Sequence, residues 1–494
     1  MTLWTAGELV TATSGHAIGN WTVSGVSIDS RTLQTGDLFV ALSAKRDGHA
    51  FVGDALQQGA GAALVSHIPE GIARTQPFLL VKDVHVALEA IGRAARARST
   101  SKVLAVTGSV GKTSTKEMLV QILGDQGHAH ASVASYNNHW GVPLTLSRMP
   151  RDTQFAIYEI GMNHPGEIEP LARMVRPHVA VITTVGAAHL ENFDSEHGIA
   201  IEKASILDGL EQNGAAILNA DSSFVDVLRA KARSVGAHIV DFGIHGQDFC
   251  LLNIHPKEEM IVVEAMHADR TFFFKLNTLG VHFATNALAA LAAAYEAGAD
   301  LALAIQTLGR WSPGSGRGSC ETIRLDPVDL TATLTLIDDS YNANPTSMSS
   351  ALNLLISPFP RGESRMPEEN LGRIYNSGHS EDCDQSEPQR RVAILGDMFE
   401  LGSRASELHR ELAQHPALAA IDVVHCVGPL MAELYDVLPA SKRGLCTPDS
   451  QGLAALIASV LEVQDIVLVK GSFAMELGHV VKAIRALGVV YGQD

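Results

Sequence analysis

Residues 103–123 read VLAVTGSVGKTSTKEMLVQIL, and this run changes from a strand pattern to a helix pattern across a glycine-rich turn. The apolar residues 103–106 predict a buried strand, and apolar residues recur at helical spacing from Met118 to Leu123. Glycines let backbone N–H groups converge on phosphate oxygens, and the N-terminus of the following helix adds a positive dipole. The run therefore predicts a strand, a phosphate-binding loop and a helix, as in a doubly wound α/β domain.

The loop has a short form of the nucleotide-binding pattern, GxxGKT, because Val106 stands where the longer pattern has glycine. The Lys112 ammonium would neutralise β- and γ-phosphate charge, and the Thr113 hydroxyl would bind Mg²⁺. A glycine-rich turn with a surface lysine is the plainer alternative, but the strand–loop–helix setting favours nucleotide binding. The loop does not distinguish ATP from GTP. The residues expected around the phosphates are Gly108, Ser109, Val110, Gly111, Lys112, Thr113 and Ser114.

Two more side chains are expected at the same edge of the sheet. Glu159 comes directly after the predicted strand 155–158, and His189 follows the predicted strand 179–182. Because ligands of a parallel sheet gather at the carboxyl ends of its strands, both would point toward the phosphate loop. A carboxylate and an imidazole there could complete the coordination of Mg²⁺. Either residue alone would be read as a cap or a loop residue.

Three polar residues in predicted helices are less informative. Lys203 reads as a solvated helix lysine, and its pattern alone gives it no role. His282 and Asn286 lie four apart at the start of an alanine-rich helix predicted to reach residue 297, and so share one face. That spacing is compatible with a contact to a nucleotide base, but a helix cap is the commoner explanation for such an asparagine.

Composition limits the class of protein. The chain has 494 residues, of which 46% are hydrophobic and 18% charged, so it is not a largely disordered protein. Aromatic residues are 5% of the total, and 37 basic against 54 acidic residues give a net charge of −17. These values exclude a stacking platform for single-stranded nucleic acid and a basic surface for duplexes. A local phosphate site needs only a few backbone amides and one lysine, so it stays compatible with the acidic total.

The same sequence predicts a cytoplasmic protein without membrane insertion. No signal peptide is visible at the N-terminus, and no run reaches the roughly 18 apolar residues of a membrane span. The five cysteines are scattered and form no CxxC pair, which argues against a disulfide framework or a cysteine zinc site.

Three regions of the chain differ in their sequence patterns, and about 150 residues per domain would suggest the same number of domains. Residues 1–98 contain short strand patterns separated by glycines. Strand and helix patterns alternate along residues 99–312, and they alternate again along residues 313–494. Within the last region, residues 361–390 are polar, charged and aperiodic, and we expect a disordered insertion there.

Taken together, the motifs resemble those of the Mur ligase family, the cytoplasmic ATP-dependent ligases that build the peptidoglycan peptide. The matching stretches are TGSVGKT (107–113), YNNHWGVP (136–143), EIGMN (159–163), GAAHLE (186–191), DDSYNANP (338–345) and LGDMFELG (395–402). The resemblance implies a small α/β UDP-binding domain at 1–98, a central P-loop ATPase domain at 99–312 and a Rossmann-like α/β domain at 313–494 that binds the amine substrate.

The two C-terminal motifs look like those of the member that adds D-alanyl-D-alanine. The resemblance therefore implies an ATP-dependent ligase that joins D-alanyl-D-alanine to UDP-N-acetylmuramoyl-tripeptide through an acyl phosphate, as a monomer with two Mg²⁺ ions. The DNPR motif expected of the diaminopimelate-adding relative does not occur in the sequence.

The resemblance also implies roles for individual residues. Lys203 would be carbamylated by CO₂ and become an anionic ligand of the second Mg²⁺, beside Thr113, Glu159 and His189. The implied catalytic residues are Lys112, Lys203 and His189. Contacts to ATP are implied for Asn286, Arg317 and Asp339, contacts to the UDP end for Ser30, Arg31 and His49, and contacts to the amine substrate for Asn342, Asn344 and Ser472.

Two other functions remain open from the sequence. A P-loop regulatory ATPase would hydrolyse nucleotide without an amine substrate. Another amide ligase of the same superfamily, such as a folylpolyglutamate synthetase, would accept a different amine, although the SYNANP segment argues against it. A purely structural protein would leave the loop, Glu159 and His189 without a purpose.

Overall fold

The protein is described by a computed structural model that covers residues 2–43, 46–133, 135–257, 260–357 and 389–490. Most of the insertion expected at 361–390 lies outside these residues. Its last residue, Arg390, is described, and its guanidinium pairs with the buried Asp465 carboxylate at 2.7 Å. The expectation of disorder is therefore wrong at Arg390, which belongs to the folded C-terminal part.

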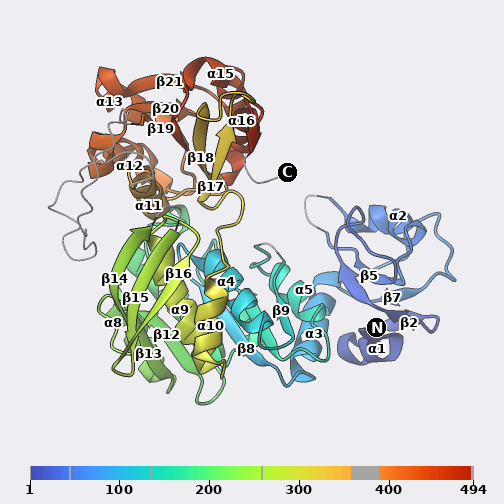
Figure 1. The fold of residues 1–494 in the computed structure, drawn as a ribbon. Coiled ribbons are helices and arrows are strands. Elements are labelled where there is room, and N and C mark those ends of the chain that lie inside the picture. Colours follow the sequence, from blue (N-terminus) through green and yellow to red (C-terminus); the bar gives the residue numbers. More distant parts are fainter. Residues whose placement is uncertain (1, 44–45, 134, 258–259, 358–388, 491–494) are drawn as a thin grey trace.

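The N-terminal part is built on a five-stranded sheet with its short helices (blue in Figure 1). The strand order is β2 (His16–Ile18), β7 (Phe78–Leu80), β6 (Ala62–Val65), β5 (Asp37–Val40) and β4 (Gly25–Ser27). A separate pair is formed by β1 (Trp4–Thr5) and β3 (Thr22–Val23), and the helices are α1 (Ala6–Thr13), α2 (Val52–Gln57) and α3 (Val84–Ala97).

The central part holds a nine-stranded sheet. Its strand order is β16 (Arg270–Leu276), β15 (Met260–His267), β14 (Phe249–Lys257), β13 (His238–Gly243), β12 (Ala215–Asn219), β11 (Val179–Ile182), β8 (Lys102–Thr107), β10 (Phe155–Glu159) and β9 (Ala129–Ala131). One face is covered by α4 (Lys112–Gly124), α9 (His282–Glu296) and α10 (Leu301–Leu308), and the other by α5 (Gly141–Ser147), α6 (Ile168–Val175), α7 (Glu196–Ala204) and α8 (Val225–Ser234).

The two-sided burial follows directly from the apolar strand sequences. In β8, Val103 and Ala105 belong to the apolar cluster on one face, whereas Leu104 and Val106 belong to the cluster on the other face. All four side chains are fully buried, because successive side chains of a strand point to opposite faces and helices cover both. This confirms the expected strand–loop–helix unit and the mainly parallel, doubly wound arrangement.

The far edge of this sheet differs from a purely parallel expectation. Strands β14, β15 and β16 pair antiparallel. The turn between β15 and β16 consists of Ala268 and Asp269, whose φ angles are 49° and 59°. Two consecutive positive φ angles make a tight hairpin of the primed type, which glycine or asparagine usually signals. An Ala-Asp pair gives only a weak sequence signal for such a turn.

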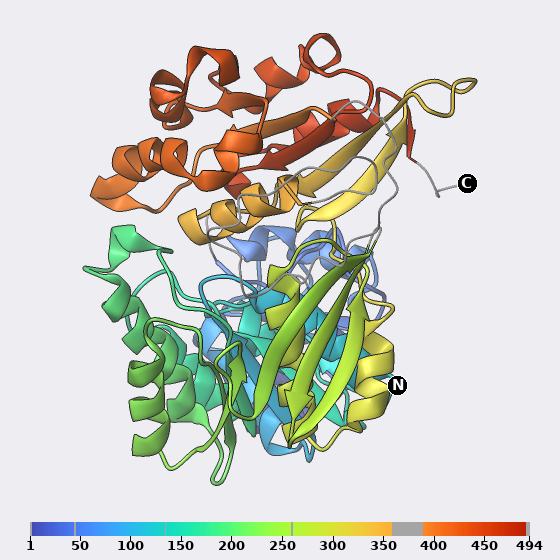
Figure 2. The same ribbon diagram turned by 60° about the vertical axis from the view of Figure 1, so that its left-hand side comes forward.

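The C-terminal part contains a seven-stranded sheet that lies above the central sheet in Figures 1 and 2. Its order is β21 (Arg443–Thr447), β20 (Val423–Val427), β19 (Arg391–Gly396), β22 (Ile466–Lys470), β18 (Thr333–Asp339), β17 (Ser319–Arg324) and β23 (Val489–Val490). Its two faces are covered by α11 (Pro345–Leu355), α12 (Ala405–Glu411) and α13 (Met431–Val437), and by α14 (Ser450–Ala454), α15 (Ile457–Val460) and α16 (Gly478–Arg485).

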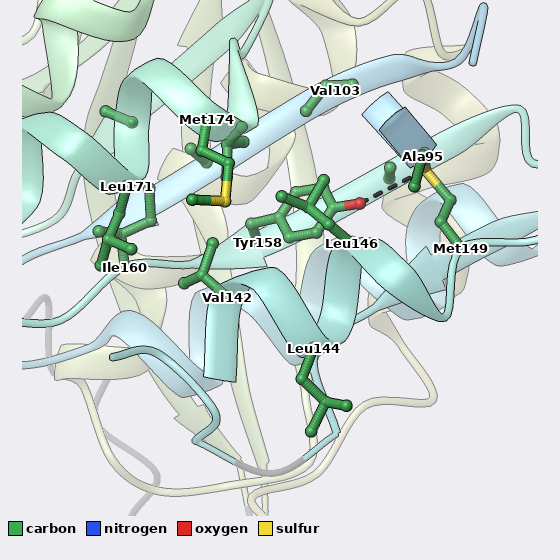
Figure 3. Close-up of a cluster of buried hydrophobic side chains, with 14 of the residues drawn as sticks. Ala95, Val103, Val142, Leu144, Leu146, Met149, Tyr158, Ile160, Leu171 and Met174 are labelled. Atoms are coloured by element: carbon green, nitrogen blue, oxygen red, sulfur yellow. Dashed lines mark hydrogen bonds between the residues drawn. The ribbon is translucent and has the colours of Figure 1, made fainter. Parts of the chain in front are cut away.

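The N-terminal and central parts share one apolar cluster. Figure 3 shows Ala95 of α3 among side chains of the central part, with the Tyr158 hydroxyl bonded to the Met149 sulfur at 3.4 Å. At the same junction the Trp4 indole N–H donates to the Ser147 carbonyl at 2.8 Å. None of the helices in the described part of the chain is long and apolar enough to span a membrane.

Candidate functional site: a phosphate loop between two sheets

The phosphate loop has the backbone geometry that its glycines suggest. Gly108 and Gly111 have φ angles of 152° and 84°, which favour glycine. A Cβ atom on Gly108 would overlap the Thr183 hydroxyl, and one on Gly111 would lie 2.5 Å from the Asn286 side-chain oxygen. The Lys112 ammonium donates to the Gly108 carbonyl at 2.6 Å and so folds back over the loop. Only glycine lets the loop backbone approach its neighbours this closely.

At the end of β10, Glu159 meets the first turn of α4. The Thr113 hydroxyl donates to one carboxylate oxygen at 2.8 Å, and the Asn137 amide donates to the other at 2.7 Å. Glu159 is 1% exposed. Hydroxyl and carboxylate oxygens are hard ligands that suit Mg²⁺, which in nucleotide sites needs few protein ligands besides phosphates and water. The described residues hold no cluster of three or more His, Cys, Asp or Glu side chains that could bind a metal ion.

Positively charged side chains lie near the Glu159 carboxylate. Burial lowers the pKa of Lys112 and of Lys116, the charge of Glu159 opposes that shift, and the charge of Arg317 adds to it. Lys116 also donates to the Ser132 carbonyl at 3.2 Å. Arg317 thus acts on both lysines beside Glu159, which is an arrangement suited to a polyanion such as a nucleotide phosphate chain.

Lys203 is buried, so the expectation of a solvated helix lysine is wrong. Its side chain is 1% exposed. Burial lowers its pKa well below the ordinary value, the nearby charge of Lys112 lowers it further, and Glu202 opposes the shift. The Glu202 carboxylate accepts the backbone N–H groups of Gly166 and Ile168 at 2.7 and 2.8 Å, at the start of α6. The Lys203 amine is therefore favoured in its neutral, nucleophilic form.

His189 lies in the loop after β11, and its imidazole faces the C-terminal part. Its Nδ1 atom is 2.5 Å from a carboxylate oxygen of Glu400, and the Glu191 N–H donates to the Glu400 carbonyl at 3.1 Å. Closer to β11 the same loop supports the phosphate loop, because the Ser109 hydroxyl donates to the Gly186 carbonyl at 2.9 Å. In this structure His189 therefore contacts Glu400, whereas Thr113 and Glu159 contact each other.

Asn286 lies beside the phosphate loop, inside α9 rather than at its end. The helix begins at His282, with Val281 as the N-cap residue, so the helix-cap explanation for Asn286 is wrong. Asn286 is 8% exposed and its amide approaches Gly111. Burial, and then the charge of Lys470, lower the pKa of His282 to about 4, so that its imidazole is neutral near neutral pH.

Two C-terminal residues expected near ATP lie at the interface with the central part. Arg317 donates to the Ser135 hydroxyl at 3.1 Å, and its guanidinium carbon lies 4.0 Å from the centre of the Tyr341 ring. Asp339 accepts from the buried Lys470 ammonium at 2.7 Å. Burial raises the pKa of the Asp339 carboxyl, and the Lys470 charge opposes that shift.

The residues expected near the amine substrate make local contacts. Asn344 caps α11 by accepting the Ser347 N–H at 2.9 Å. The Asn342 side-chain oxygen accepts the next backbone N–H at 2.8 Å. Ser472 is 4% exposed, and its hydroxyl accepts the Phe399 N–H at 2.9 Å. The Ser472 hydroxyl also donates to the carbonyl of Ala343, which lies between Asn342 and Asn344, at 3.5 Å, so the three residues lie near one another after the ends of β18 and β22.

The residues expected at the UDP end lie in the N-terminal part, which Figure 1 shows beside the central part and away from the C-terminal part. Ser30 is half-buried in a turn, and the Arg31 guanidinium pairs with Asp29 at 2.7 Å. His49 is 6% exposed. Its imidazole lies 2.7 Å from the Asp47 carboxylate and accepts the Ser66 N–H at 3.0 Å. Hydrogen bonds to His49 lower the pKa of Asp47 to about 2.

Several contact residues had no expected role in the sequence. Ser135 and Tyr341 stood inside or beside the recognised motifs without a role, and their meeting requires residues 206 apart in the chain to touch. The other unassigned contact residues are Lys116, Asn137, Glu400 and Lys470. The motifs could have drawn attention to these positions, but the pairings become visible only in the folded chain.

Three family models match the chain. They are the Mur ligase family catalytic domain at residues 22–96, the Mur ligase middle domain at residues 106–294, and the Mur ligase glutamate ligase domain at residues 381–473.

Relatives match over nearly the whole length. The UDP-N-acetylmuramoyl-tripeptide–D-alanyl-D-alanine ligase of Escherichia coli (strain K12) is 33% identical over 472 residues, which cover 94% of this chain and 95% of the relative. The crystal structure of MurF from Acinetobacter baumannii is 29% identical, with a TM-score of 0.80 and 98% of both chains covered. MurF from Thermotoga maritima, solved in complex with ADP, is 25% identical, with a TM-score of 0.74, and 94% of this chain and 98% of that one are covered.

Proposed function

The chain belongs to the Mur ligase family, and from that premise we propose that it joins D-alanyl-D-alanine to UDP-N-acetylmuramoyl-tripeptide with ATP, in the synthesis of peptidoglycan precursors. The observation that carries this proposal is the 33% identity to the Escherichia coli ligase over 95% of that protein. The enzyme is an ATP-dependent ligase that forms an amide bond. This function is favoured over a folylpolyglutamate-synthetase-like ligase or a regulatory ATPase, because the curated relatives that match over nearly the whole chain carry the D-alanyl-D-alanine ligase name.

An amine cannot displace the oxygen of a carboxylate directly, because that oxygen is a poor leaving group. The carboxylate must first be converted into a derivative with a better leaving group. ATP would phosphorylate the terminal carboxylate of the tripeptide to give an acyl phosphate. The amine of D-alanyl-D-alanine would then attack the acyl carbon, a tetrahedral intermediate would form, and phosphate would leave. Phosphoryl transfer depends mainly on positioning and electrostatic stabilisation, so the protein's part is to hold charged groups in place.

The residues around the loop suit that task. The backbone amides of residues 108–114 and the Lys112 ammonium would bind the phosphate chain, Asn286 would lie beside it, and Arg317 and Asp339 would contact the nucleotide from the C-terminal part. Bound Mg²⁺ would neutralise charge on the transferring phosphoryl group. Thr113 and Glu159 would hold the first ion, because their hard oxygen atoms already meet at 2.8 Å.

Lys203 would help to hold a second Mg²⁺ after carbamylation. The neutral Lys203 amine can attack CO₂ and lose a proton, which converts the amine into an anionic oxygen ligand. Its burial and the neighbouring charge of Lys112 support this role, because both favour the neutral amine. In the structure His189 contacts Glu400, so its proposed coordination of the ion requires the imidazole to turn away from that carboxylate.

The two substrate ends would be held by separate parts of the chain. Ser30, Arg31 and His49 would contact the UDP end, and Asn342, Asn344 and Ser472 the amine substrate. Residues 1–98, 99–312 and 313–494 would then serve as UDP-binding, ATP-binding and amine-binding domains. Closure of the last over the central sheet would exclude water from the acyl phosphate. The monomeric state and the cytoplasmic location remain predictions of the sequence.

The decisive assay follows ADP release by the purified protein. ATP, Mg²⁺ and UDP-N-acetylmuramoyl-tripeptides with diaminopimelate or lysine at the third position are supplied with and without D-alanyl-D-alanine. We expect turnover only when tripeptide and dipeptide are both present. If ADP release does not depend on the dipeptide, the result would instead support a regulatory ATPase. If ADP release depends on a different amine, it would support another ligase of the superfamily.

A further inference from the structure

One hydroxyl links the C-terminal part to the phosphate-loop region. Ser135 of the central part accepts hydrogen bonds from the Arg317 guanidinium at 3.1 Å and from the Tyr341 hydroxyl at 3.2 Å. Its oxygen also lies 3.4 Å from the Thr113 hydroxyl, which itself donates to Glu159. The donor of Thr113 is thus already used, so in the remaining contact Ser135 donates to Thr113. A serine hydroxyl has one donor and two acceptor sites, and all are used here.

The direction of this chain of hydrogen bonds is therefore set. It runs from Arg317 and Tyr341 through Ser135 and Thr113 to the Glu159 carboxylate. The Thr113 oxygen keeps one lone pair for a metal ion, because it has two and Ser135 uses one. The chain is hence compatible with the metal role proposed for Thr113.

Tyr341 also determines where Arg317 lies. Its ring sits beneath the guanidinium, with 4.0 Å from the guanidinium carbon to the ring centre. The Tyr341 N–H donates to the Gly316 carbonyl at 2.9 Å, which joins the backbones of the two segments. The exposed Phe473 ring contacts Tyr341 as well, with 5.7 Å between ring centres. A planar guanidinium that stacks on one ring and shares an acceptor with that ring's hydroxyl has little freedom to turn.

We propose that Tyr341 is a positioning residue, which aims the Arg317 guanidinium at the terminal phosphate of the bound nucleotide through its ring and through the shared Ser135 hydroxyl. The proposal rests on the function proposed above, because it needs a nucleotide in the loop. It separates two tasks at one position: the ring supports the guanidinium, and the hydroxyl fixes its direction. Arg317 also lies close enough to act electrostatically on Lys112, which places it near the phosphate end of the site.

The test compares Tyr341→Leu, which removes ring and hydroxyl, with Tyr341→Phe, which removes the hydroxyl alone. Tyr435→Leu is the matched control, since Tyr435 lies beneath Arg443 at 5.3 Å in the same C-terminal part and donates to the Gly444 carbonyl. Two measurements are made: the kinetics of ADP release, which give kcat and the ATP KM, and the ratio of the dissociation constants for ADP and a non-hydrolysable ATP analogue.

We expect Tyr341→Leu to lower kcat by roughly ten- to a hundredfold and to reduce the preference for the analogue over ADP by about tenfold. Tyr341→Phe should retain most of that preference because the ring remains. Tyr435→Leu should change either quantity by less than about twofold. In an Arg317→Gln background, Tyr341→Leu should change the preference no further, because the guanidinium it positions is gone.

Two outcomes would overturn the proposal. One is an unchanged preference for the ATP analogue in Tyr341→Leu, and the other is an equal loss of preference with and without Arg317. If Tyr341→Leu does not fold, Tyr341→Phe and Ser135→Ala test the hydroxyl alone: each should lower kcat severalfold because the direction of the guanidinium is no longer fixed, and an unchanged kcat in both would overturn the proposal. Binding is measured without dipeptide, so failure of this proposal is distinct from failure of the ligase function, which the dipeptide dependence of wild-type turnover decides.

Discussion

At the scale of single residues, Lys203 shows how position changes the chemistry of a side chain. In sequence it resembles any helix lysine, because a helical pattern does not tell which face is buried when alanine and isoleucine surround it. In the fold it is 1% exposed and near the Lys112 charge. Glu159, by contrast, could be placed from sequence, because the end of an apolar strand is visible in the pattern and parallel strands share an edge.

We predict that Lys203→Ala abolishes ligase activity and that short-chain carboxylates restore part of it. The proposed carbamate is an anionic oxygen ligand, and a free carboxylate can occupy the space left by the side chain. Lys203→Met should be equally inactive. In CO₂-free buffer, where Lys203 is an unmodified amine, it should be more stable than the wild type by on the order of 1–2 kcal/mol, because a buried amine with a lowered pKa destabilises the fold at neutral pH. ADP-release assays and urea unfolding measure the two effects. Full activity of Lys203→Ala would contradict the assigned role.

A second residue prediction concerns Gly111. Gly111→Ala should weaken nucleotide binding by at least about tenfold, because its Cβ would lie 2.5 Å from Asn286 and its φ of 84° already favours glycine. Gly71→Ala is the control: Gly71 has a φ of 81°, and an added Cβ would have nothing within 4 Å. Equal losses of nucleotide affinity in both variants, measured by titration, would show that the clash with Asn286 is irrelevant.

At the scale of helices and strands, an element could be predicted where its own residues carry the sequence pattern. Strand β8 and helix α4 were clear from their apolar pattern, since the pattern and the burial arise from the same residues. The antiparallel strands β14 to β16 were not expected, because their Ala268-Asp269 turn lacks the usual glycine or asparagine. Helix α9 begins at His282, which the sequence had placed with Asn286 at the start of the alanine-rich helix.

The first turn of α11 offers a test at this scale. Asn344 and Ser347 form a capping box, so Asn344→Ala should lower stability by about 1 kcal/mol, whereas Asn344→Ser should preserve it. Serine lacks the amide N–H donors that a substrate carboxylate would need. If Asn344 also contacts the amine substrate, Asn344→Ser raises the KM for D-alanyl-D-alanine severalfold at unchanged thermal stability. An unchanged KM in this variant would restrict Asn344 to its role as a cap.

At the scale of the whole molecule, the C-terminal part meets the central part through polar contacts. His189 with Glu400, and Ser135 with Arg317 and Tyr341, join segments that are far apart in sequence. Motifs could suggest which segments take part, but not which side chains meet, because that depends on how the two sheets are placed. The net charge of −17 was likewise uninformative about the site, where Lys112 and Lys116 lie near Glu159 and the charge of Arg317 acts on both lysines.

The contact between His189 and Glu400 predicts a pH dependence. The hydrogen bond with His189 lowers the pKa of the Glu400 carboxyl. The contribution of Glu400 to folding stability is therefore complete above its ordinary pKa of 4.5, and it is lost as the pH falls through the lowered pKa of the folded protein. Glu400 is 47% exposed at its side chain, so the effect should stay below about 1 kcal/mol. The difference in unfolding free energy between wild type and Glu400→Gln should therefore shrink toward acid pH.

Glu407→Gln is the control for that titration, because Glu407 forms an exposed ion pair with Arg404 three residues away in the same segment. The Glu407→Gln substitution should change the unfolding free energy only slightly at every pH. If the difference in unfolding free energy between wild type and Glu400→Gln grew toward acid pH, the assigned contact between His189 and Glu400 would be contradicted.

The apolar cluster shared by α3 and the central part has a consequence for how the molecule melts. Leu9, Leu38 and Leu79 belong to the same cluster as Val103 and Tyr158. The two C-terminal clusters draw on residues beyond 313 apart from Leu279 and the partly buried Leu190. The N-terminal part thus cannot lose its packing without exposing the flank of the central sheet. In a calorimeter the first two thirds of the chain should behave as one cooperative unit, with the C-terminal part as a second, separable transition.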